Sequence, residues 1–425
     1  MSRVKTKKSK SDKVKVSDGK SFSFADLNKE LKKIAPLGST MDLSEFSEIS
    51  EYIGTGSLIL NACLTGSLRK GYPNNRAVSL CGPSGVGKTF LMLNAARMAQ
   101  AMGYYIAWYD SENAVDRDIM LKFGIDPERV WYEPVSTVEA FRTSGTNLAQ
   151  RLIDAKRKGL SIPKIMIFLD SAGNLASEKE IRDAEDGSNK ADMTRAKMFK
   201  SVFRILMNKF AEIKAPFIFS NHTYQTQEMF SQMKSGGGTG PEYAASIILF
   251  ITKAKLNEKI KDDKGKKANK QLGIILNIKP NKNRFAKPSA VKIHLSFNKG
   301  MNEYVGLESY LNWEDFGIGK GNIIPGNEYK KVKGDKKDRA IEYTDESTGE
   351  VFYYIPDDKG SNIAVKHLNS TVNTREFYTD KVFTDKIIDQ IDAVVQRDFS
   401  YGIDEDLPTD DLFDGDDEDD NNDED

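Results

Sequence analysis

One segment of the sequence has residue types and spacing that suit it to binding a phosphate group. Residues 82–89 read Gly82-Pro83-Ser84-Gly85-Val86-Gly87-Lys88-Thr89 and fit the pattern G-x-x-x-x-G-K-[ST]. The glycines allow backbone N–H groups to turn inward around a phosphate. Lys88 can reach the β- and γ-phosphates of a nucleotide, and Thr89 can hold Mg²⁺. The segment therefore predicts a site for ATP and Mg²⁺; the alternative is a glycine-rich turn that matches by accident.

The flanking residues favour the phosphate-binding interpretation. Residues 77–81 are short, apolar and β-prone, and residues 90–99 are rich in Leu, Met and Ala without Gly or Pro, which is typical of a helix. A loop between a strand and a helix places a bound phosphate at the positive end of the helix dipole.

Polar residues also follow other predicted strands, where ligands of parallel sheets bind. Asp170 follows the apolar run 165–169 and is predicted to reach the Mg²⁺ shell, although an aspartate there could instead cap a helix. Glu112 ends an earlier strand and could activate an attacking water, with Asp110 as its rival. His222 ends a later strand and could sense the γ-phosphate, or it could be an ordinary packed or surface histidine.

The elements that position these residues alternate between strand and helix, which predicts an α/β fold with a mostly parallel, twisted sheet covered by helices on both faces. The expected strands are 77–81, 104–109, 131–135, 165–169, 217–220, 245–252, 273–278 and 291–297. The expected helices after the phosphate loop are 138–158, interrupted at Gly145, and 191–213. A lysine-rich hairpin, residues 255–270, is expected to join two of the later strands.

Composition divides the chain into five regions. Residues 1–20 form a basic arm with eight Lys or Arg against two Asp, and residues 404–425 hold fourteen Asp or Glu and no Lys or Arg. Both tails are low in apolar residues and are expected to be disordered. Between them we expect an amphipathic helix within 21–44 (Phe24 to Ile34), which packs either on the core of its own chain or, in an oligomer, on a neighbour. The ATPase core is expected at 45–300 and a small mixed C-terminal region at 301–400, and the acidic tail begins near 401.

A loop after the strand at 217–220 has a composition suited to a nucleic-acid backbone. Residues 224–241 contain Tyr224, Phe230 and the run Gly236-Gly237-Gly238-Thr239-Gly240. Aromatic side chains stack on bases, and glycines allow close approach to a backbone. A flexible surface loop with no partner is the alternative.

The apolar runs and the cysteines of the sequence argue against a membrane protein and against a secreted protein. No apolar run approaches the roughly 20 residues of a membrane span, and the basic N-terminus lacks the apolar stretch of a secretory signal. The two cysteines, Cys63 and Cys81, lack metal-type spacing, so a reducing, cytoplasmic setting is expected, in a bacterial host if the chain is phage-encoded.

Taken together, these motifs resemble the RecA-type DNA strand-exchange recombinases. The phosphate loop, the strand ends at 110–112, 169–171 and 221–222, and the GGGTG run follow one another in RecA order. The chain is particularly similar to the recombinases of T-even bacteriophages, a likeness carried by residues 124–130, 192–197 and 221–241. The resemblance covers roughly residues 45–300 well, the C-terminal region loosely and the basic arm hardly at all.

The resemblance implies an ATP-dependent helical filament on single-stranded DNA that pairs this strand with a homologous duplex. It implies DNA-dependent ATP hydrolysis in recombination, repair and recombination-dependent replication. It further implies a loader or mediator and a single-strand-binding protein as partners, and no membrane.

The resemblance also assigns residues around the nucleotide. Asp116 would lie near the adenine, and Ile119 stands where RecA has an aromatic residue that stacks on the base. Lys282 and Arg284 match the pair that reaches across the filament interface to the neighbour's ATP, with Lys279 as a possible substitute. The implied catalytic set is Glu112, Lys88, His222, Lys282 and Arg284, and the implied nucleotide set is residues 82–89 with Asp116 and Asp170.

Two DNA-binding loops follow from the same likeness. The first should lie near 178–193, with Met193, Lys197 and Arg204 at DNA-contacting positions. The second should be residues 224–240, including Tyr224, Phe230, Gly236, Gly237 and Gly238.

Three other classes share parts of this pattern. A hexameric helicase with a RecA-like core would use a ring and unwind duplexes, and a recombinase-like regulator would bind nucleotide without strand exchange. A nucleoside or nucleotide kinase shares the phosphate loop, but it needs an acceptor site and lid arginines that the sequence does not display.

Overall fold

A single large sheet carries the strand ends from which the predicted site is built. The computed structural model describes residues 14–15, 21–35, 38–41, 44, 48–187, 195–225, 233–235, 240, 244–261 and 267–401. Nine strands of this part of the chain pair in the order β15-β14-β13-β12-β5-β9-β8-β6-β7. They are β5 (Ala77–Cys81), β6 (Tyr105–Asp110), β7 (Val130–Pro134), β8 (Ile165–Asp170), β9 (Phe217–Asn221), β12 (Ile247–Lys261), β13 (Lys267–Asn283), β14 (Val291–Ser296) and β15 (Gly300–Met301).

The sheet is parallel from β12 through β5, β9, β8 and β6 to β7, and antiparallel from β12 to β15. The predicted α/β class with a mostly parallel sheet is confirmed. The carboxyl ends of β5, β6, β8 and β9 therefore lie along one edge of the sheet, which is where their polar residues were expected to meet.

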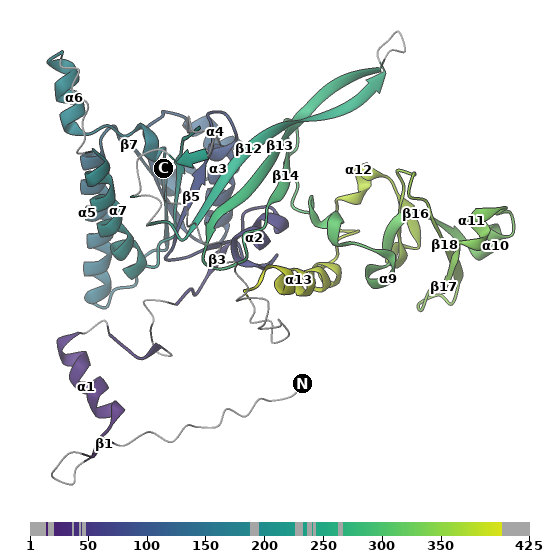
Figure 1. The fold of residues 1–425 in the computed structure, drawn as a ribbon, viewed down its shortest axis with the longest axis horizontal. Helices are drawn as coiled ribbons and strands as arrows, with labels where there is room; N and C mark the ends of the chain where they lie inside the picture. Colours follow the sequence, from purple (N-terminus) through teal and green to yellow (C-terminus); the bar gives the residue numbers. More distant parts are fainter. Residues whose placement is uncertain are drawn as a thin grey trace, which may run out of the picture.

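Helices cover both faces of the sheet (Figure 1). They are α2 (Leu58–Thr65), α3 (Lys88–Ala101), α4 (Arg117–Lys122), α5 (Val138–Arg157), α6 (Glu178–Glu185) and α7 (Arg195–Glu212), with 3-10 turns η2 (Pro127–Arg129) and η3 (Ala172–Asn174). On β5, Val78 and Leu80 belong to the core beneath α2 and α3, whereas Ala77 and Cys81 belong to the core beneath α5 and α7. This alternation follows from the two-residue period of a strand.

The predicted helix 138–158 is confirmed as α5, but the expected interruption at Gly145 was wrong, because α5 runs unbroken from Val138 to Arg157. A Cβ atom at Gly145 would lie 3.4 Å from the Leu206 side chain of α7, so the glycine allows the two helices to pack closely. The predicted helix 191–213 is confirmed from Arg195 onward, and residues 191–194 lie outside the described residues.

The predicted helix at 24–34 is confirmed as α1 (Phe24–Ile34). Ser23 and Asp26 form a capping box at its start, which satisfies two backbone N–H groups that a helix leaves unpaired. None of its residues is buried, and in Figure 1 it lies apart from the sheet. The apolar stripe Leu27, Leu31 and Ile34 is therefore exposed.

The expectation for the lysine-rich segment 255–270 was wrong in its extent. Most of it belongs to β12 and β13, which continue their pairing out to Lys261 and Lys267 and form a ribbon that projects from the sheet (Figure 1). The chain lacks apolar periodicity there because a two-stranded ribbon that covers no core does not need an apolar face.

The C-terminal region forms a second sheet of five antiparallel strands in the order β17-β18-β16-β19-β20. Its elements are η4 (Leu307–Tyr310), α9 (Trp313–Phe316), β16 (Ile318–Pro325), α10 (Gly326–Tyr329), α11 (Asp335–Asp338), β17 (Ile341–Thr344), β18 (Val351–Pro356), β19 (Ile363–Val365), η5 (Lys366–Leu368), β20 (Ser370–Val372), α12 (Thr374–Phe377) and α13 (Asp385–Phe399). α13 joins this region to the core, because buried Asp392 accepts hydrogen bonds from the Leu68 backbone (2.6 Å) and the Ser67 hydroxyl (3.1 Å).

Short strand pairs complete the described structure: β1 (Val14–Lys15) with β2 (Ser21–Phe22), β3 (Tyr52–Ile53) with β4 (Tyr72–Pro73), and β10 (Thr223–Gln225) with β11 (Met233–Ser235). The acidic tail and most of the basic arm lie outside the described residues, as do the predictions made for them. No helix in the described part of the chain has the length and apolar character needed to cross a membrane.

Candidate functional site

The phosphate loop joins the end of β5 to the start of α3, as predicted. Gly85 and Gly87 adopt positive φ angles of 66° and 104°, which a residue with a Cβ rarely adopts. Lys88 is 6% exposed, and its ammonium donates to the carbonyl oxygens of Gly82 (2.9 Å) and Pro83 (3.0 Å). Burial lowers the pKa of Lys88, and the nearby carboxylates of Glu112 and Asp170 oppose that shift. A buried cation thus lies over a loop shaped to turn its N–H groups toward an anion.

Thr89 and Asp170 meet across the sheet edge. The Thr89 hydroxyl donates to Asp170 Oδ2 at 2.6 Å, and the Ser220 hydroxyl at the end of β9 donates to Asp170 Oδ1. Burial raises the pKa of Asp170, while the hydrogen bonds from Ser220 and Thr89 lower it and the neighbouring Glu112 raises it further. The carboxylate is 1% exposed, so it is a strong candidate for a cation ligand.

The oxygen donors of this edge fit Mg²⁺ bound together with a nucleotide. Mg²⁺ is usually held by one or two carboxylates and by substrate phosphates, and Thr89 with Asp170 supplies a hydroxyl and a carboxylate oxygen next to the phosphate loop. Among the described residues, no group of three His, Cys, Asp or Glu side chains could hold a metal alone. The residues present therefore suit a metal that arrives with ATP.

Glu112 and His222 are brought together from β6 and β9. His222 Nε2 lies 2.9 Å from Glu112 Oε1, and their side chains are 34% and 25% exposed respectively. The pair is therefore within reach of solvent and of a bound ligand. The contact joins the two strand ends that carry Glu112 and His222. The role of His222 as a sensor of the γ-phosphate stays a prediction.

The structure distinguishes Glu112 from Asp110, the other candidate for the residue that activates water. Asp110 is 1% exposed and accepts backbone N–H groups from Glu112 (2.8 Å), Ala114 (3.1 Å) and Val115 (3.3 Å), as well as the Tyr132 hydroxyl (3.2 Å). Its lone pairs are occupied in holding the loop after β6. Glu112 is consequently the better candidate for a base.

The two residues that the resemblance places near the nucleotide base lie at the start of α4. Asp116 caps α4 by accepting the Ile119 backbone N–H at 2.7 Å, and Ile119 packs against the core. The base-binding role of Asp116 stays a prediction.

Lys282 lies level with the middle of β5, and Arg284 follows it toward the amino end of β5, away from the phosphate loop. Lys282 pairs with Ile248 of β12, and Ile248 pairs with Ser79, which lies before the loop on β5. Arg284 is exposed beyond the end of β13, and its charge contributes to a lowered pKa of Arg76, after the larger effect of burial. These cations are not brought to Lys88 within one chain. Lys279, their possible substitute, is exposed on the same strand.

The predicted DNA contacts fall partly outside the described residues, namely Met193, Phe230, Gly236, Gly237 and Gly238. Lys197 and Arg204 are exposed on α7, seven residues apart and so near one helical face. The backbone of Tyr224 pairs with Lys234 in the β10–β11 hairpin. Gly240 packs against α7, where an added Cβ would lie 2.8 Å from the Lys200 backbone. The end of the second predicted loop therefore adjoins the helix that carries Lys197 and Arg204.

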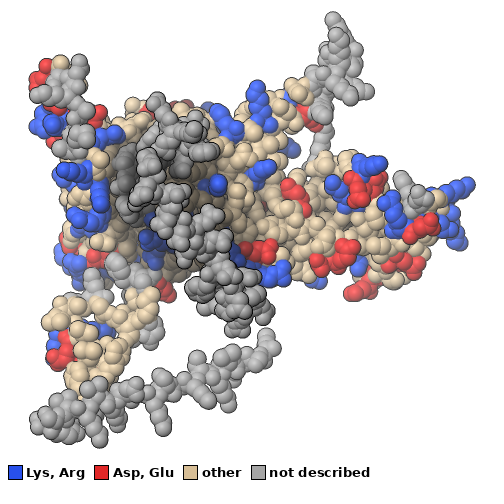
Figure 2. Space-filling model, viewed as in Figure 1, with Lys and Arg blue, Asp and Glu red and all other residues tan. Residues whose placement is uncertain are grey.

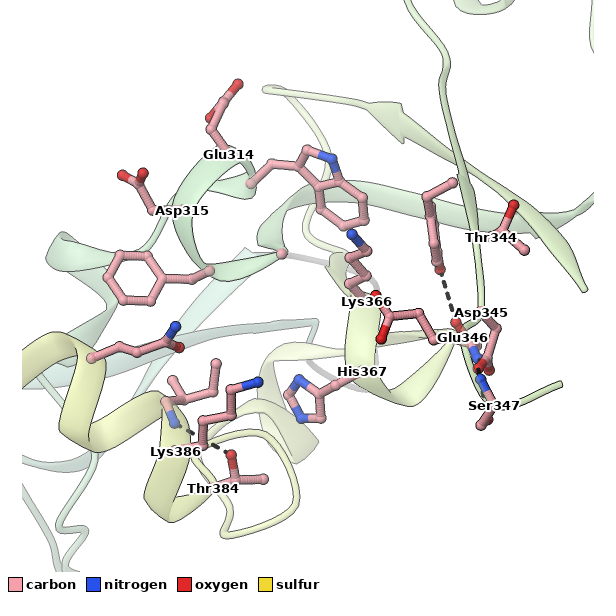
Figure 3. Close-up of a pocket in the computed structure, with 17 residues that line it drawn as sticks. Glu314, Asp315, Thr344, Asp345, Glu346, Ser347, Lys366, His367, Thr384 and Lys386 are labelled. Atoms are coloured by element: carbon pink, nitrogen blue, oxygen red, sulfur yellow. Dashed lines mark hydrogen bonds between the residues drawn. The ribbon is translucent and has the colours of Figure 1, made fainter. Parts of the chain in front are cut away.

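Two parts of the surface differ in their charged side chains (Figure 2). Lysines on the ribbon and at the tip of the C-terminal sheet are exposed: Lys253, Lys255, Lys270, Lys330, Lys331, Lys333 and Lys337. A cleft in the C-terminal region is instead lined by four acidic residues, Glu314, Asp315, Asp345 and Glu346, and by Lys366 and Lys386 (Figure 3). This cleft holds no predicted site residue, and its excess of carboxylates would repel a phosphate backbone.

Sequence reasoning missed the role of Ser111, between Asp110 and Glu112. Its backbone N–H donates to the Asp170 carbonyl oxygen at 2.7 Å, and its hydroxyl exchanges hydrogen bonds with the backbone of Ser171. A serine at a strand end carries no signal of its own, so only the geometry reveals these bonds.

Comparison with known proteins agrees with this geometry. Residues 24–302 match the RecA N-terminal domain. The chain is 34% identical over 334 residues to the "Recombination and repair protein" of Enterobacteria phage T4, covering 77% of each protein. It is also 28% identical over 272 residues to "Protein RecA" of Bacteroides thetaiotaomicron (62% of this chain, 74% of that protein) and 29% identical over 305 residues to that of Acholeplasma laidlawii (70% and 85%).

Proposed function

Because the chain belongs to the RecA family of recombination proteins, we propose that it hydrolyses ATP while assembled as a helical filament on single-stranded DNA. In this filament it pairs the bound strand with a homologous duplex and exchanges strands. The observation that carries the ATPase part is the meeting of Lys88, Thr89, Asp170 and Glu112 at one sheet edge, with Thr89 2.6 Å from Asp170 and His222 2.9 Å from Glu112.

Each residue of this edge has a role that follows from its chemistry. The loop 82–89 binds the phosphates through its backbone N–H groups, and Lys88 neutralises charge on the β- and γ-phosphates. Thr89 and Asp170 would hold Mg²⁺, and a bound Mg²⁺ would supply positive charge beside the phosphates. Glu112 accepts a proton from the attacking water. His222 connects this base to the β10 hairpin that begins at the next residue, so a contact made by the second DNA loop can reach the base.

Two surfaces support self-assembly. α1 exposes Leu27 (37%), Leu31 (44%) and Ile34 (79%), and a free amphipathic helix of this kind gains stability by packing on another chain. β7 is an edge strand with Trp131 62% exposed, and edge strands of open sheets readily accept a partner. A head-to-tail filament could bury both surfaces and bring Lys282 and Arg284 to the neighbour's ATP.

Basic surfaces support DNA as the partner. Lys197 and Arg204 on α7 would contact the single strand together with residues 224–240, and the exposed lysines of the β12–β13 ribbon suit a duplex. Such contacts bind without regard to sequence, so homology would be read by base pairing. A loader or mediator and a single-strand-binding protein are proposed as partners, in the cytoplasm of the cell in which recombination and recombination-dependent replication proceed.

A DNA strand-pairing assay with and without ATP tests the proposal. The full chain should convert a single strand and a homologous duplex into joint molecules only with ATP and Mg²⁺, and micrographs should show filaments. Lys88→Ala should hydrolyse no ATP and form no joint molecules. Unwinding of a duplex by a ring-shaped assembly would instead indicate a helicase, and wild-type turnover by Lys88→Ala would refute the assignment of the phosphate loop.

A further inference from the structure

A cluster of three hydrogen bonds ties together the two strand ends that carry Glu112 and Asp170. The Ser111 backbone N–H donates to the Asp170 carbonyl oxygen at 2.7 Å. The Ser111 hydroxyl donates to the Ser171 carbonyl oxygen at 2.7 Å and accepts the Ser171 N–H at 2.9 Å. One side chain therefore satisfies both backbone groups of the neighbouring residue.

Because these hydrogen bonds lie at the ends of two neighbouring strands, they restrain the position of Glu112. β6 and β8 are parallel neighbours in which Asp110 pairs with Asp170, and Ser111 and Ser171 are the first residues beyond that register. Ser171 is fully buried, so water cannot easily replace the hydrogen bonds of its backbone. Ser111 is directly followed by Glu112, so a shift of Ser111 moves the start of the Glu112 side chain.

Glu112 and Asp170 are like charges at one sheet edge, with the Lys88 ammonium near both of them. Glu112 contributes to the raised pKa of Asp170, which places the two charges within electrostatic reach. Repulsion between like charges opposes the close approach of the loop after β6 to the end of β8. The three hydrogen bonds of Ser111 hold that loop close to β8.

We propose that Ser111 is a positioning residue that fixes Glu112 relative to Asp170 and so sets the alignment of the attacking water with the metal-bound phosphate. The inference rests on the proposed ATPase function and adds to it a residue outside the phosphate loop. Ser111 does not need to touch ATP; it acts through the placement of Glu112.

Ser111→Ala in the full chain tests the proposal. Steady-state ATP hydrolysis on single-stranded DNA should show kcat lowered by roughly ten-fold or more, because a small displacement of a reacting group has large effects on rate. The KM for ATP and the affinity for a fluorescent ATP analogue should change by less than about two-fold, because the loop and Lys88 are untouched. Ser111→Thr keeps the hydroxyl and should recover most of the lost kcat.

Thr146→Val is the matched control. The Thr146 hydroxyl on α5 is buried without a hydrogen-bond partner in the described part of the chain, so its removal should leave kcat, KM and the melting temperature near wild type. Equal kcat in Ser111→Ala and wild type would overturn the proposal. So would loss of kcat with an equal loss of nucleotide affinity, or equal damage in Ser111→Ala and Ser111→Thr.

The same experiment separates this proposal from the proposed function. A wild-type chain that hydrolyses no ATP with DNA present refutes the proposed function and, with it, the role of Ser111. An active wild-type chain with an equally active Ser111→Ala variant refutes only the role of Ser111.

Discussion

Lys282 and Arg284 should complete the nucleotide site of a neighbouring chain, because they cannot reach their own. Lys282 is level with Ser79 of β5, two strands away, and the phosphate loop begins three residues later at Gly82. Strand geometry places these positions about 10 Å apart along the strands and about 10 Å across them. That separation exceeds the reach of a lysine side chain. Arg284 lies farther still, since β13 runs antiparallel to β12 and away from the loop.

Complementation between two inactive variants measures this sharing. Lys282→Ala and Glu112→Gln should each lower ATP turnover on single-stranded DNA by roughly 10³-fold, the effect expected for a cation that stabilises transition-state charge or for a lost base. In a 1:1 mixture, random head-to-tail assembly gives about one quarter of the interfaces an intact Glu112 facing an intact Lys282. The mixture should therefore regain about one quarter of wild-type turnover.

A second mixture serves as the control. Lys282→Ala mixed with Arg284→Ala should not recover, because every contributing edge then lacks one of the two cations. If the first mixture is no more active than the mean of its two components, the nucleotide site is not shared between chains and the interpretation of the sheet register is wrong.

Three further predictions follow from particular contacts. Because burial raises the pKa of Asp170 above its usual 3.8, Mg²⁺-dependent nucleotide binding should weaken as pH falls, at higher pH than for an exposed aspartate, and titration calorimetry should show Asp170→Asn weak at every pH. Asp392→Ala should lower the unfolding free energy by about 2–5 kcal/mol in denaturant melts by leaving Leu68 N–H and the Ser67 hydroxyl unpaired, against less than about 1 kcal/mol for Asp389→Ala, whose ion pair with Arg69 is exposed. Deleting residues 404–425 should tighten DNA binding by removing fourteen acidic residues, and unchanged binding across several salt concentrations would contradict this.

The phosphate loop could be predicted because its information is local. Strand, loop and helix are contiguous, and the glycines that adopt positive φ lie within the motif itself. The apolar strand before Asp170 was equally clear, since a strand buried on both faces reads as an unbroken apolar run. Such features depend on residues close together in the chain.

The ribbon formed by β12 and β13 could not be predicted in the same way. Its outer half pairs Leu256 with Gly273 and continues to Lys261 and Lys267 through backbone hydrogen bonds. Exposed strands have no buried face, so hydropathy cannot distinguish them from a loop. The same limit applies to Asp392, whose importance comes from partners more than 300 residues earlier in the chain.

The carboxylates at the sheet edge show why geometry, and not residue type, decides which of them can do chemistry. Asp110 already accepts hydrogen bonds from three backbone N–H groups and a tyrosine hydroxyl, so both of its carboxylate oxygens have partners within the fold. Asp170 accepts two hydroxyls, of which the one on Thr89 can turn to a metal ion once that ion is present. Among the residues that the structure describes, Glu112 hydrogen-bonds through its side chain only to His222, on an element that continues into the predicted DNA loop. The number and kind of existing partners thus support the roles that we propose for these three residues: Asp110 as a structural support, Asp170 as a metal ligand and Glu112 as a base. Their spacing in the sequence leaves this assignment open.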